Sequence, residues 1–353
     1  MVYTRKITKV LLPFLCIVIC GTQSGADEDR LYWFGDIPAF LNQQHAYSLA
    51  AAEALLDKYP PSLEAPLERR SAFLLLDNVF HDPEAVNYEA VSQFFLRRTQ
   101  AAAAALQDAP PAQGARIWKL YNHGFIVCSA TATVAFDIIS GQHFNNEAFR
   151  LPEAVVDAFA DQCDALFISH WHRDHADFVV AQAFIDRGKP VVLPQGFWNE
   201  EPIAAQLTRF ERDASTVHAL PVREGSVLLD VVVYPGHQGE DTLNNITLVR
   251  FPDGFTVAHT GDQSNLRDFK WMDAIKQRHR VDVLLPNCWT PAMPRMIAGF
   301  DPEVVILGHE NELGHTIDHR EPYWLNARRL GEATVRAVAM TWGESYAYTR
   351  SRK

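Results

Sequence analysis

Cysteine is scarce in this sequence, with only five in 353 residues. Three of them, Cys128, Cys163 and Cys288, lie beyond the first 26 residues. An odd number argues against a disulfide-dense scaffold, although a single bridge among the three stays open. A chain of this length can bury a large apolar core without such cross-links, so we expect one large domain with an extension.

Basic charge is also in the minority. The chain has 32 lysines and arginines against 43 aspartates and glutamates, which gives a formal net charge of −11. Non-specific binding to nucleic acid needs a basic face, so we expect no nucleic-acid partner. Net charge says nothing about the fold.

Hydrophobic runs long enough to span a bilayer are absent as well. The longest candidate, residues 10–20, has about half of the roughly 20 residues that a spanning helix needs, and Pro13 interrupts it. Basic residues precede this run and the small residues Ser24-Gly25-Ala26 follow it. This order is typical of a cleaved export signal.

We therefore expect residues 1–26 to be a signal peptide that is removed before Asp27. The mature protein would be periplasmic or extracellular and would contain no transmembrane segment. A lipid anchor through Cys20 is the less favoured alternative, because Ile19 is bulky where such sites carry a small residue.

The N-terminal region, residues 27–114, has a helical composition. Alanine, leucine and glutamate dominate three stretches that prolines separate, at residues 47–56, 67–79 and 89–106. The sequence leaves open whether this region is a cap over a cleft, an interaction surface or a structural support.

From residue 117 onward, β-rich stretches alternate with helical ones. We expect strands at 117–129, 131–139, 165–168, 191–194, 226–234, 245–251, 254–259, 281–285 and 303–307. We expect helices at 152–162, 177–187, 198–212, 266–277 and 323–338. Such alternation predicts an α/β fold with sheets covered by helices.

The most informative segment is His170-Trp171-His172-Arg173-Asp174-His175, which follows an expected strand and precedes an expected helix. Side chains at i and i+2 of extended backbone point the same way, so His170 and His172 can reach one ion. Asp174 and His175 lie where the chain turns into the helix and can reach a second ion. Histidine and carboxylate are common zinc ligands, whereas the plain alternative is a histidine-rich polar loop.

Several other expected strands end in one candidate ligand each. His237 follows one strand, Asp262 follows another and His309 a third. Loops at strand ends are where α/β scaffolds build active sites, so this recurrence predicts a shared site. We favour a structural role for His259, and we expect His143 to face solvent because it lies in a loop with glycine and asparagine.

The ordered set His-x-His-x-Asp-His, then His, Gly-Asp and His resembles the metallo-β-lactamase superfamily of metal-dependent hydrolases, over about residues 115–350. It is similar to the branch containing ascorbate-6-phosphate lactonase and the phospholipase D acting on N-acylethanolamine phospholipids, where an acidic residue often occupies the position of Asp177. Asn122-His123-Gly124-Phe125 and Phe136-Asp137 resemble the family's first two strands. The resemblance implies an αββα sandwich over residues 115–353, with the helical region as an N-terminal extension.

The resemblance also implies two divalent metal ions, with zinc expected and manganese as the alternative. His170, His172 and His237 would bind one ion. Asp174, His175 and His309 would bind the other, and Asp262 would bind both. Two cations lower the pKa of a bound water and polarise the oxygen under attack. The implied catalytic residues are Asp262, which would bridge the ions, and Asp174, which would orient the bridging hydroxide. Asp137 would support a ligand imidazole.

The segment after His309 holds further candidates. His315 and His319 have the i, i+4 spacing that places two imidazoles on one helix face. His309 is preferred over His315 as the sixth ligand because of its position at a strand end. His315, His319 and Arg320 are then candidates for substrate contact, as is Asn287 after another strand. The competing role for these residues is a polar network that fastens the loop.

The sequence therefore predicts an exported dinuclear hydrolase that cleaves an ester, lactone or phosphodiester bond in a small-molecule or lipid-like substrate. One alternative is a mononuclear iron oxygenase acting on thiols, which the same fold hosts. The other is a non-catalytic metal-binding or interaction protein. Oligomeric state is left open.

Overall fold

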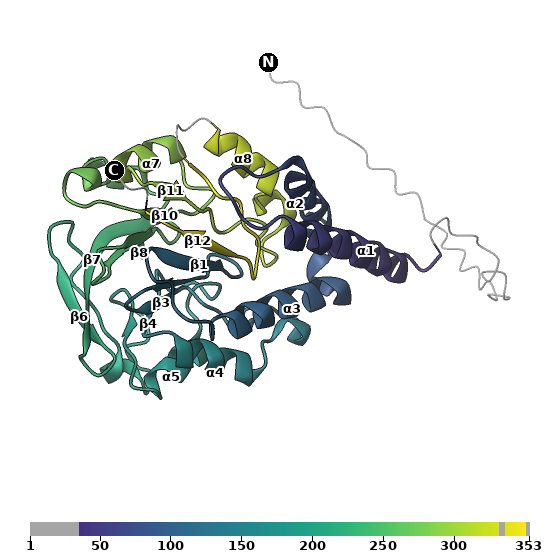
Figure 1. Ribbon diagram of the computed structural model, residues 1–353. Helices are drawn as coiled ribbons and strands as arrows, with labels where there is room; N and C mark the ends of the chain where they lie inside the picture. Colours follow the sequence, from purple (N-terminus) through teal and green to yellow (C-terminus); the bar gives the residue numbers. More distant parts are fainter. Residues whose placement is uncertain (1–34, 332–335, 351–353) are drawn as a thin grey trace, which may run out of the picture.

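Two six-stranded sheets form the centre of the molecule in the computed structural model, which describes residues 35–331 and 336–350 (Figure 1). The expected signal peptide and Cys20 lie outside these residues. Helices cover the outer side of each sheet, so the predicted αββα sandwich is confirmed. In the described part of the chain, no helix is both long and apolar enough to cross a membrane.

The first sheet has the order β12-β1-β2-β3-β4-β5, with β3, β4 and β5 parallel and the other pairs antiparallel. Its strands are β1 (Ala115–Lys119), β2 (Phe125–Ser129), β3 (Thr133–Phe136), β4 (Ala165–Phe167), β5 (Val191–Val192) and β12 (Ser345–Tyr348).

The second sheet has the order β11-β10-β9-β8-β7-β6. Its strands are β6 (His218–Val222), β7 (Val227–Gln238), β8 (Thr242–Arg250), β9 (Thr256–His259), β10 (Val283–Leu285) and β11 (Val304–Val305). The pairs β9–β10 and β10–β11 are parallel, and β6 to β9 run antiparallel to one another.

Strand periodicity explains why the sheets stack. Successive side chains of a strand point to opposite faces. Ile117 and Val127 therefore pack in the apolar layer between the sheets, whereas Trp118 and Ile126 pack under the helices outside the first sheet. Because both faces of the sheets are covered, the strands read as nearly continuous apolar runs.

The N-terminal helices share the hydrophobic cluster on the outer face of the first sheet with α4 and α5. α6 and α7 cover the second sheet, and α8 contacts both α2 and α7. The helices are α1 (Ile37–Lys58), α2 (Leu67–Phe80), α3 (Glu89–Ala105), α4 (Glu153–Gln162), α5 (Phe178–Ile185), α6 (Phe269–Met272), α7 (Met293–Phe300) and α8 (Tyr323–Leu330).

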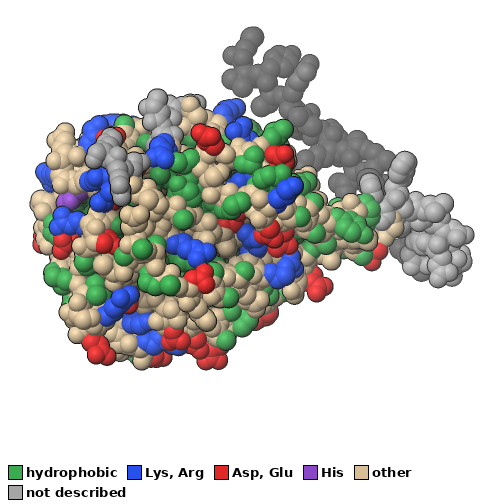
Figure 2. All heavy atoms as spheres, in the orientation of Figure 1, with side chains coloured by type: hydrophobic (Ala, Val, Ile, Leu, Met, Phe, Trp, Pro, Cys, Tyr) green, Lys and Arg blue, Asp and Glu red, His purple; other side chains and the backbone are tan. Residues whose placement is uncertain are grey.

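The outer end of α1 projects from the body of the molecule (Figure 1). Figure 2 shows hydrophobic side chains along this projection, among them those of α1, whose Ile37 is 46% and Tyr47 61% exposed. On the rest of this face, positive and negative side chains are interspersed, so no patch of a single sign dominates it.

The expected strand at 117–129 is wrong, because the chain forms two strands there. Between β1 and β2, the Leu120 amide donates to the Gly124 carbonyl and closes a tight turn. The turn holds Asn122 and His123, both fully buried. A continuous apolar run concealed this reversal, since periodicity alone does not distinguish one long buried strand from two short ones.

Three expected helices are also wrong in extent. Residues 198–212 contain only a 3₁₀ turn at Ala204–Gln206, because Thr208 pairs with Val192 instead. Residues 266–277 break into α6 and two 3₁₀ turns. The third helix, α8, ends at Leu330, and Ala337 pairs with Val305. Tertiary pairing outweighs helix propensity around Thr208 and Ala337.

A buried ion pair fastens α2 to the C-terminal part of the chain. Both terminal nitrogens of Arg69 donate to the Glu344 carboxylate, at 2.8 and 2.7 Å, and also to the carbonyls of Tyr59 and Ala339. The side chains are 0% and 4% exposed. Glu344 also accepts from the Thr341 amide, so this carboxylate is fully enclosed by donors.

Replacing Arg69 with methionine should lower the free energy of unfolding by about 3–5 kcal/mol, because Glu344 would remain as an uncompensated buried charge. Arg70→Met is the matched control, since Arg70 is exposed and donates to the Ala65 carbonyl; its effect should stay within about 0.5 kcal/mol. Urea unfolding followed by circular dichroism measures both. Equal losses in the two variants would contradict the role of the ion pair.

Candidate metal centre

The candidate ligands follow strands whose carboxyl ends meet at one edge of the sandwich. The segment from His170 to His175 follows β4, Asp262 follows β9 and His309 follows β11. β9, β10 and β11 are parallel, so Asp262 and His309 emerge on the same side. The Asn245 amide donates to the Ser169 carbonyl at 2.7 Å, which joins the edges of the two sheets at this place.

The carboxylate of Asp262 lies at the centre of the cluster. Its Oδ2 is 3.8 Å from His170 Nε2 and 3.3 Å from the Nε2 atoms of both His175 and His309. Asp174 Oδ2 is 3.2 Å from His175 Nε2 and 3.5 Å from His309 Nε2. These contacts bring together residues that are far apart along the chain.

Six of the seven expected ligands form two donor groups. The first is His170, His172 and Asp262, and the second is Asp174, His175 and His309; within each group the donor atoms lie within 4.8 Å of one another. The Nε2 atoms of His170, His175 and His309 are buried without a hydrogen-bond partner. Buried polar atoms normally have partners, so converging unpaired imidazoles beside carboxylates suit divalent metal ions.

The seventh expected ligand, His237, belongs to neither group. Its Nδ1 lies 3.1 and 3.2 Å from the two carboxylate oxygens of Asp268, and its side chain is 27% exposed. The neighbouring Gln238 donates to Asp262 Oδ2 at 3.1 Å. Ligand histidines usually bind a carboxylate through their other nitrogen. The structure thus places His237 beside the cluster, with its Nδ1 bound to a carboxylate.

Charges within the cluster strongly alter its titration. Burial alone would raise the pKa of Asp262, but the facing His175 and His309 hold that pKa well below its usual range. Burial alone would lower the pKa of His309, but Asp262 and Asp174 outweigh it and raise the pKa to about 10. Burial, reinforced by His175, lowers the pKa of His170 to about 3.

Asp137 supports the cluster from behind. Its Oδ2 lies 2.7 Å from His175 Nδ1 and accepts from the Ser169 hydroxyl at 2.5 Å, and its Oδ1 accepts from the Ser169 amide. The Ser169 hydroxyl also lies 3.0 Å from His170 Nδ1. Asp137 has a φ of +45°, a region that residues other than glycine rarely adopt. These contacts orient the ligand-facing nitrogens of two histidines.

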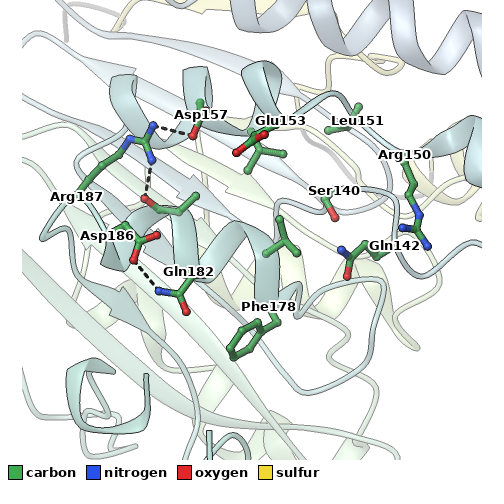
Figure 3. Close-up of a pocket in the computed structure, with 13 residues that line it drawn as sticks. Ser140, Gln142, Arg150, Leu151, Glu153, Asp157, Phe178, Gln182, Asp186 and Arg187 are labelled. Carbon is green, nitrogen blue, oxygen red and sulfur yellow. Dashed lines mark hydrogen bonds and ion pairs between the residues drawn. The ribbon is translucent and has the colours of Figure 1, made fainter. Parts of the chain in front are cut away.

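Asp177 organises the loop next to the cluster. Its Oδ1 accepts from the Val179 and Val180 amides and caps α5, and its Oδ2 accepts from the amide and hydroxyl of Ser140. Ser140 also lines a cavity of about 420 Å³ between α4 and α5, which Figure 3 shows. The residues lining this cavity include no candidate ligand, so the cavity is not the candidate metal site.

The segment after β11 is tied to the N-terminal helices. His309 has a φ of +72° and Asn311 a φ of +53°. The side-chain amide of Asn311 donates to Asp77 of α2 at 2.9 Å, and the Lys119 ammonium donates to the Glu310 carboxylate at 2.5 Å. α2 and β1 therefore hold the loop that carries His309 in an unusual backbone conformation.

Arg320, a candidate for substrate contact, lies in this fastening network. It is 5% exposed, and its guanidinium donates to the carbonyls of Phe80, Asp82 and Leu313. Its contacts are those of the competing structural role that the sequence left open.

The other candidates differ in position. The His315 ring stacks on His309 with centroids 5.6 Å apart, whereas the His319 side chain is 73% exposed. Asn287 donates to Asp262 Oδ1 at 2.8 Å, so it holds the central carboxylate. The expectation that His143 faces solvent is wrong. Its side chain is 6% exposed and lies 3.7 Å from Glu312.

Sequence reasoning linked two residues in the turn between β1 and β2 to the family's first strands but gave them no role at the site. The Asn122 side-chain amide donates to Asp174 Oδ2 at 3.0 Å, and the Asn122 backbone carbonyl accepts from the His309 backbone amide. His123 Nδ1 lies 3.9 Å from Asp262 Oδ1. The signal was a polar Asn-His pair inside an apolar stretch, which predicts a turn or a buried site. The buried His259 ring stacks on Phe136. Its Nε2 lies 3.0 Å from the His123 carbonyl and 4.0 Å from Asp137 Oδ2, and its Nδ1 accepts from the Gly261 backbone amide.

A solved structure of another protein has a similar fold over two thirds of this chain. Igni18, a metallo hydrolase from the archaeon Ignicoccus hospitalis, superposes with a TM-score of 0.51 at 15% identity, over 67% of this chain and 99% of that one. The chain has the metallo-β-lactamase fold. No family model and no curated protein matches the sequence.

Two further structures are similar over a comparable share of the chain. A possible metal-dependent hydrolase from Veillonella parvula has a TM-score of 0.48 at 14% identity, over 67% of this chain and all of that one. CmlA, a diiron β-hydroxylase from Streptomyces venezuelae, has a TM-score of 0.46 at 13% identity, over 68% of this chain and 55% of that one.

The three cysteines that the structure describes are free and buried. Burial raises the pKa of the Cys163 and Cys288 thiols. The single disulfide bridge that the sequence left open is therefore not formed among Cys128, Cys163 and Cys288.

Asp137→Asn should weaken metal binding by about 10–100-fold, because the amide orients His175 less well than the carboxylate does. Asp164→Asn is the matched control: Asp164 is also buried, but it accepts from the Thr133 amide at the opposite end of β4. Competition with a fluorescent chelator measures both affinities. Equal affinities in the two variants would refute the supporting role of Asp137.

Metal binding should release protons at neutral pH. Burial lowers the pKa of His175, but the surrounding carboxylates outweigh it and raise the pKa well above its usual range, as with His309. With a pKa of about 10, His309 is protonated in the metal-free protein at pH 7 and must lose a proton to bind an ion. Calorimetry in buffers of different ionisation enthalpy should detect this release, and affinity should rise with pH. An affinity independent of pH between 6 and 8 would contradict the prediction.

Proposed function

We propose that this protein is an exported, dinuclear metal-dependent hydrolase that cleaves an ester, lactone or phosphodiester bond. The observation that carries the proposal is the convergence of six nitrogen and oxygen donors from three strand ends on one buried place. The proposal assigns His170, His172, His237 and Asp262 to one ion and Asp174, His175, His309 and Asp262 to the other. Zinc is the expected metal and manganese the alternative.

Bound divalent ions would supply a nucleophile from water at neutral pH and polarise the oxygen of the bond under attack. The protein's own groups determine the rest. Asp174 is ionised, because His175 and His309 outweigh the effect of burial and hold its pKa well below the usual range. Its carboxylate can accept a hydrogen bond from the attacking water and orient it. Asn122 keeps that carboxylate in position.

The substrate class rests on the motif. The acidic Asp177 after the histidine motif supports the branch of lactonases and phospholipases rather than the β-lactamases. In this structure Asp177 caps α5 and holds Ser140, so it acts on the loop and not on the substrate. His315, which stacks on His309 and is half-buried, is the proposed substrate contact.

Metal analysis of the purified protein, together with ester, lactone, phosphodiester and β-lactam substrates, tests the proposal. His172→Ala and Asp262→Ala should each reduce kcat/KM by at least about 100-fold, more than the loss typical of residues behind the ligands. His218→Ala is the control, since the His218 ring stacks on Phe210 and contacts the Glu211 carbonyl.

Activity that survives both changes would overturn the proposed mechanism. Bound iron together with oxygen consumption in the presence of a thiol would favour the oxygenase instead. Absence of any bound metal at micromolar zinc or manganese would remove the basis of both the hydrolase and the oxygenase.

A further inference from the structure

His123 is a buried histidine without a hydrogen-bond partner for either ring nitrogen among the described residues. Its side chain is 0% exposed. A buried polar atom without a partner is costly, so two on a single ring call for an explanation. If only the packing of an aromatic ring were needed here, phenylalanine would fill the position equally well, and this chain has many phenylalanines in its core.

The position of His123 relative to Asp262 gives that explanation. His123 Nδ1 is 3.9 Å from Asp262 Oδ1, close to the 3.8 Å between His170 and Asp262 Oδ2. Donor atoms of His123, His175 and Asp262 lie within 4.8 Å of one another. His123 therefore faces the carboxylate oxygen opposite to the one that faces His170, His175 and His309.

The surrounding chain makes room for this ring. A Cβ on Gly308 would lie 2.1 Å from His123 Cδ2, so only glycine fits at that position. The His259 ring packs against the His123 ring at a tilt of 36°, with centroids 4.2 Å apart. The His123 carbonyl accepts from His259 Nε2 at 3.0 Å, which fixes the backbone of the turn. The ring is thus held in one place by packing rather than by its own polar atoms.

We propose that His123 is an additional ligand of the metal centre and binds a divalent ion together with His175 and Asp262. One carboxylate oxygen of Asp262 then lies on the side of His123, and the other lies on the side of the remaining ligands. The ion is of the zinc type, which accepts imidazole nitrogen and carboxylate oxygen. The inference rests on the proposed metal centre and adds to it a residue from a turn that the sequence pattern does not mark as a ligand.

Cobalt(II) substitution tests the assignment directly in the unaltered protein. Each imidazole bound to cobalt(II) gives its own paramagnetically shifted proton resonances. The five histidines of the proposed centre account for five sets, and binding by His123 adds one more. A spectrum with no more than five sets overturns the inference without the use of any variant.

His123→Phe provides the second arm, because it keeps an aromatic ring and removes both nitrogens. The variant should bind one equivalent of zinc at least about 10–100-fold more weakly and should lose one set of imidazole resonances. His143→Phe is the matched control. His143 is also buried and has two unpaired ring nitrogens, but it belongs to none of the donor groups. It should retain the affinity and the spectrum of the parent.

The outcomes separate this inference from the proposed function. A parent that binds zinc while His123→Phe matches it in affinity and spectrum overturns the inference alone. His123→Phe that binds zinc more weakly but keeps as many sets of imidazole resonances as the parent also overturns it, because His123 would then only position Asp262. A parent that binds neither zinc nor cobalt overturns both proposals.

Discussion

The structure depends on a buried carboxylate that is surrounded by histidines. Asp262 is 2% exposed and lies within 4 Å of His170, His175 and His309. An isolated buried charge would be very costly, so the site is stable only with compensating positive charge. Asp262 and Asp174 raise the pKa of His309 to about 10, so its protonated imidazole provides such charge in the metal-free protein. Divalent ions would replace the protons, which links metal binding, protonation and folding at one place.

Holding these side chains together requires the whole sandwich. The donors come from loops after β4, β9 and β11, and the two sheets must stack in one relative position for these loops to meet. Further contacts secure each loop. Asp137 orients His175 from the first sheet, and Asn287 holds Asp262 from the second. Strained backbone at Asp137 and His309 persists because these contacts determine it.

The N-terminal helices belong to this support. Their apolar residues share one cluster with the outer face of the first sheet, and α2 makes polar contacts to segments near the C-terminus. Asp77 accepts from Asn311 and from the Tyr323 amide, and Arg69 pairs with Glu344. Of the roles that the sequence left open, the described contacts are those of a structural support for the loop that carries His309. The projecting end of α1 is the part that these contacts leave uncovered.

Local chemistry in the sequence determined the fold class, the order of most elements and the types of residue at the strand ends. The histidine and aspartate spacing is a local property, as is the strand or helix periodicity around it. Only the tertiary structure decided which of these residues converge. It turned His237 toward Asp268, buried His143 and divided an apolar run so that His123 entered the centre. Those outcomes depend on distances between residues far apart in the chain, and the packing of the two sheets sets these distances.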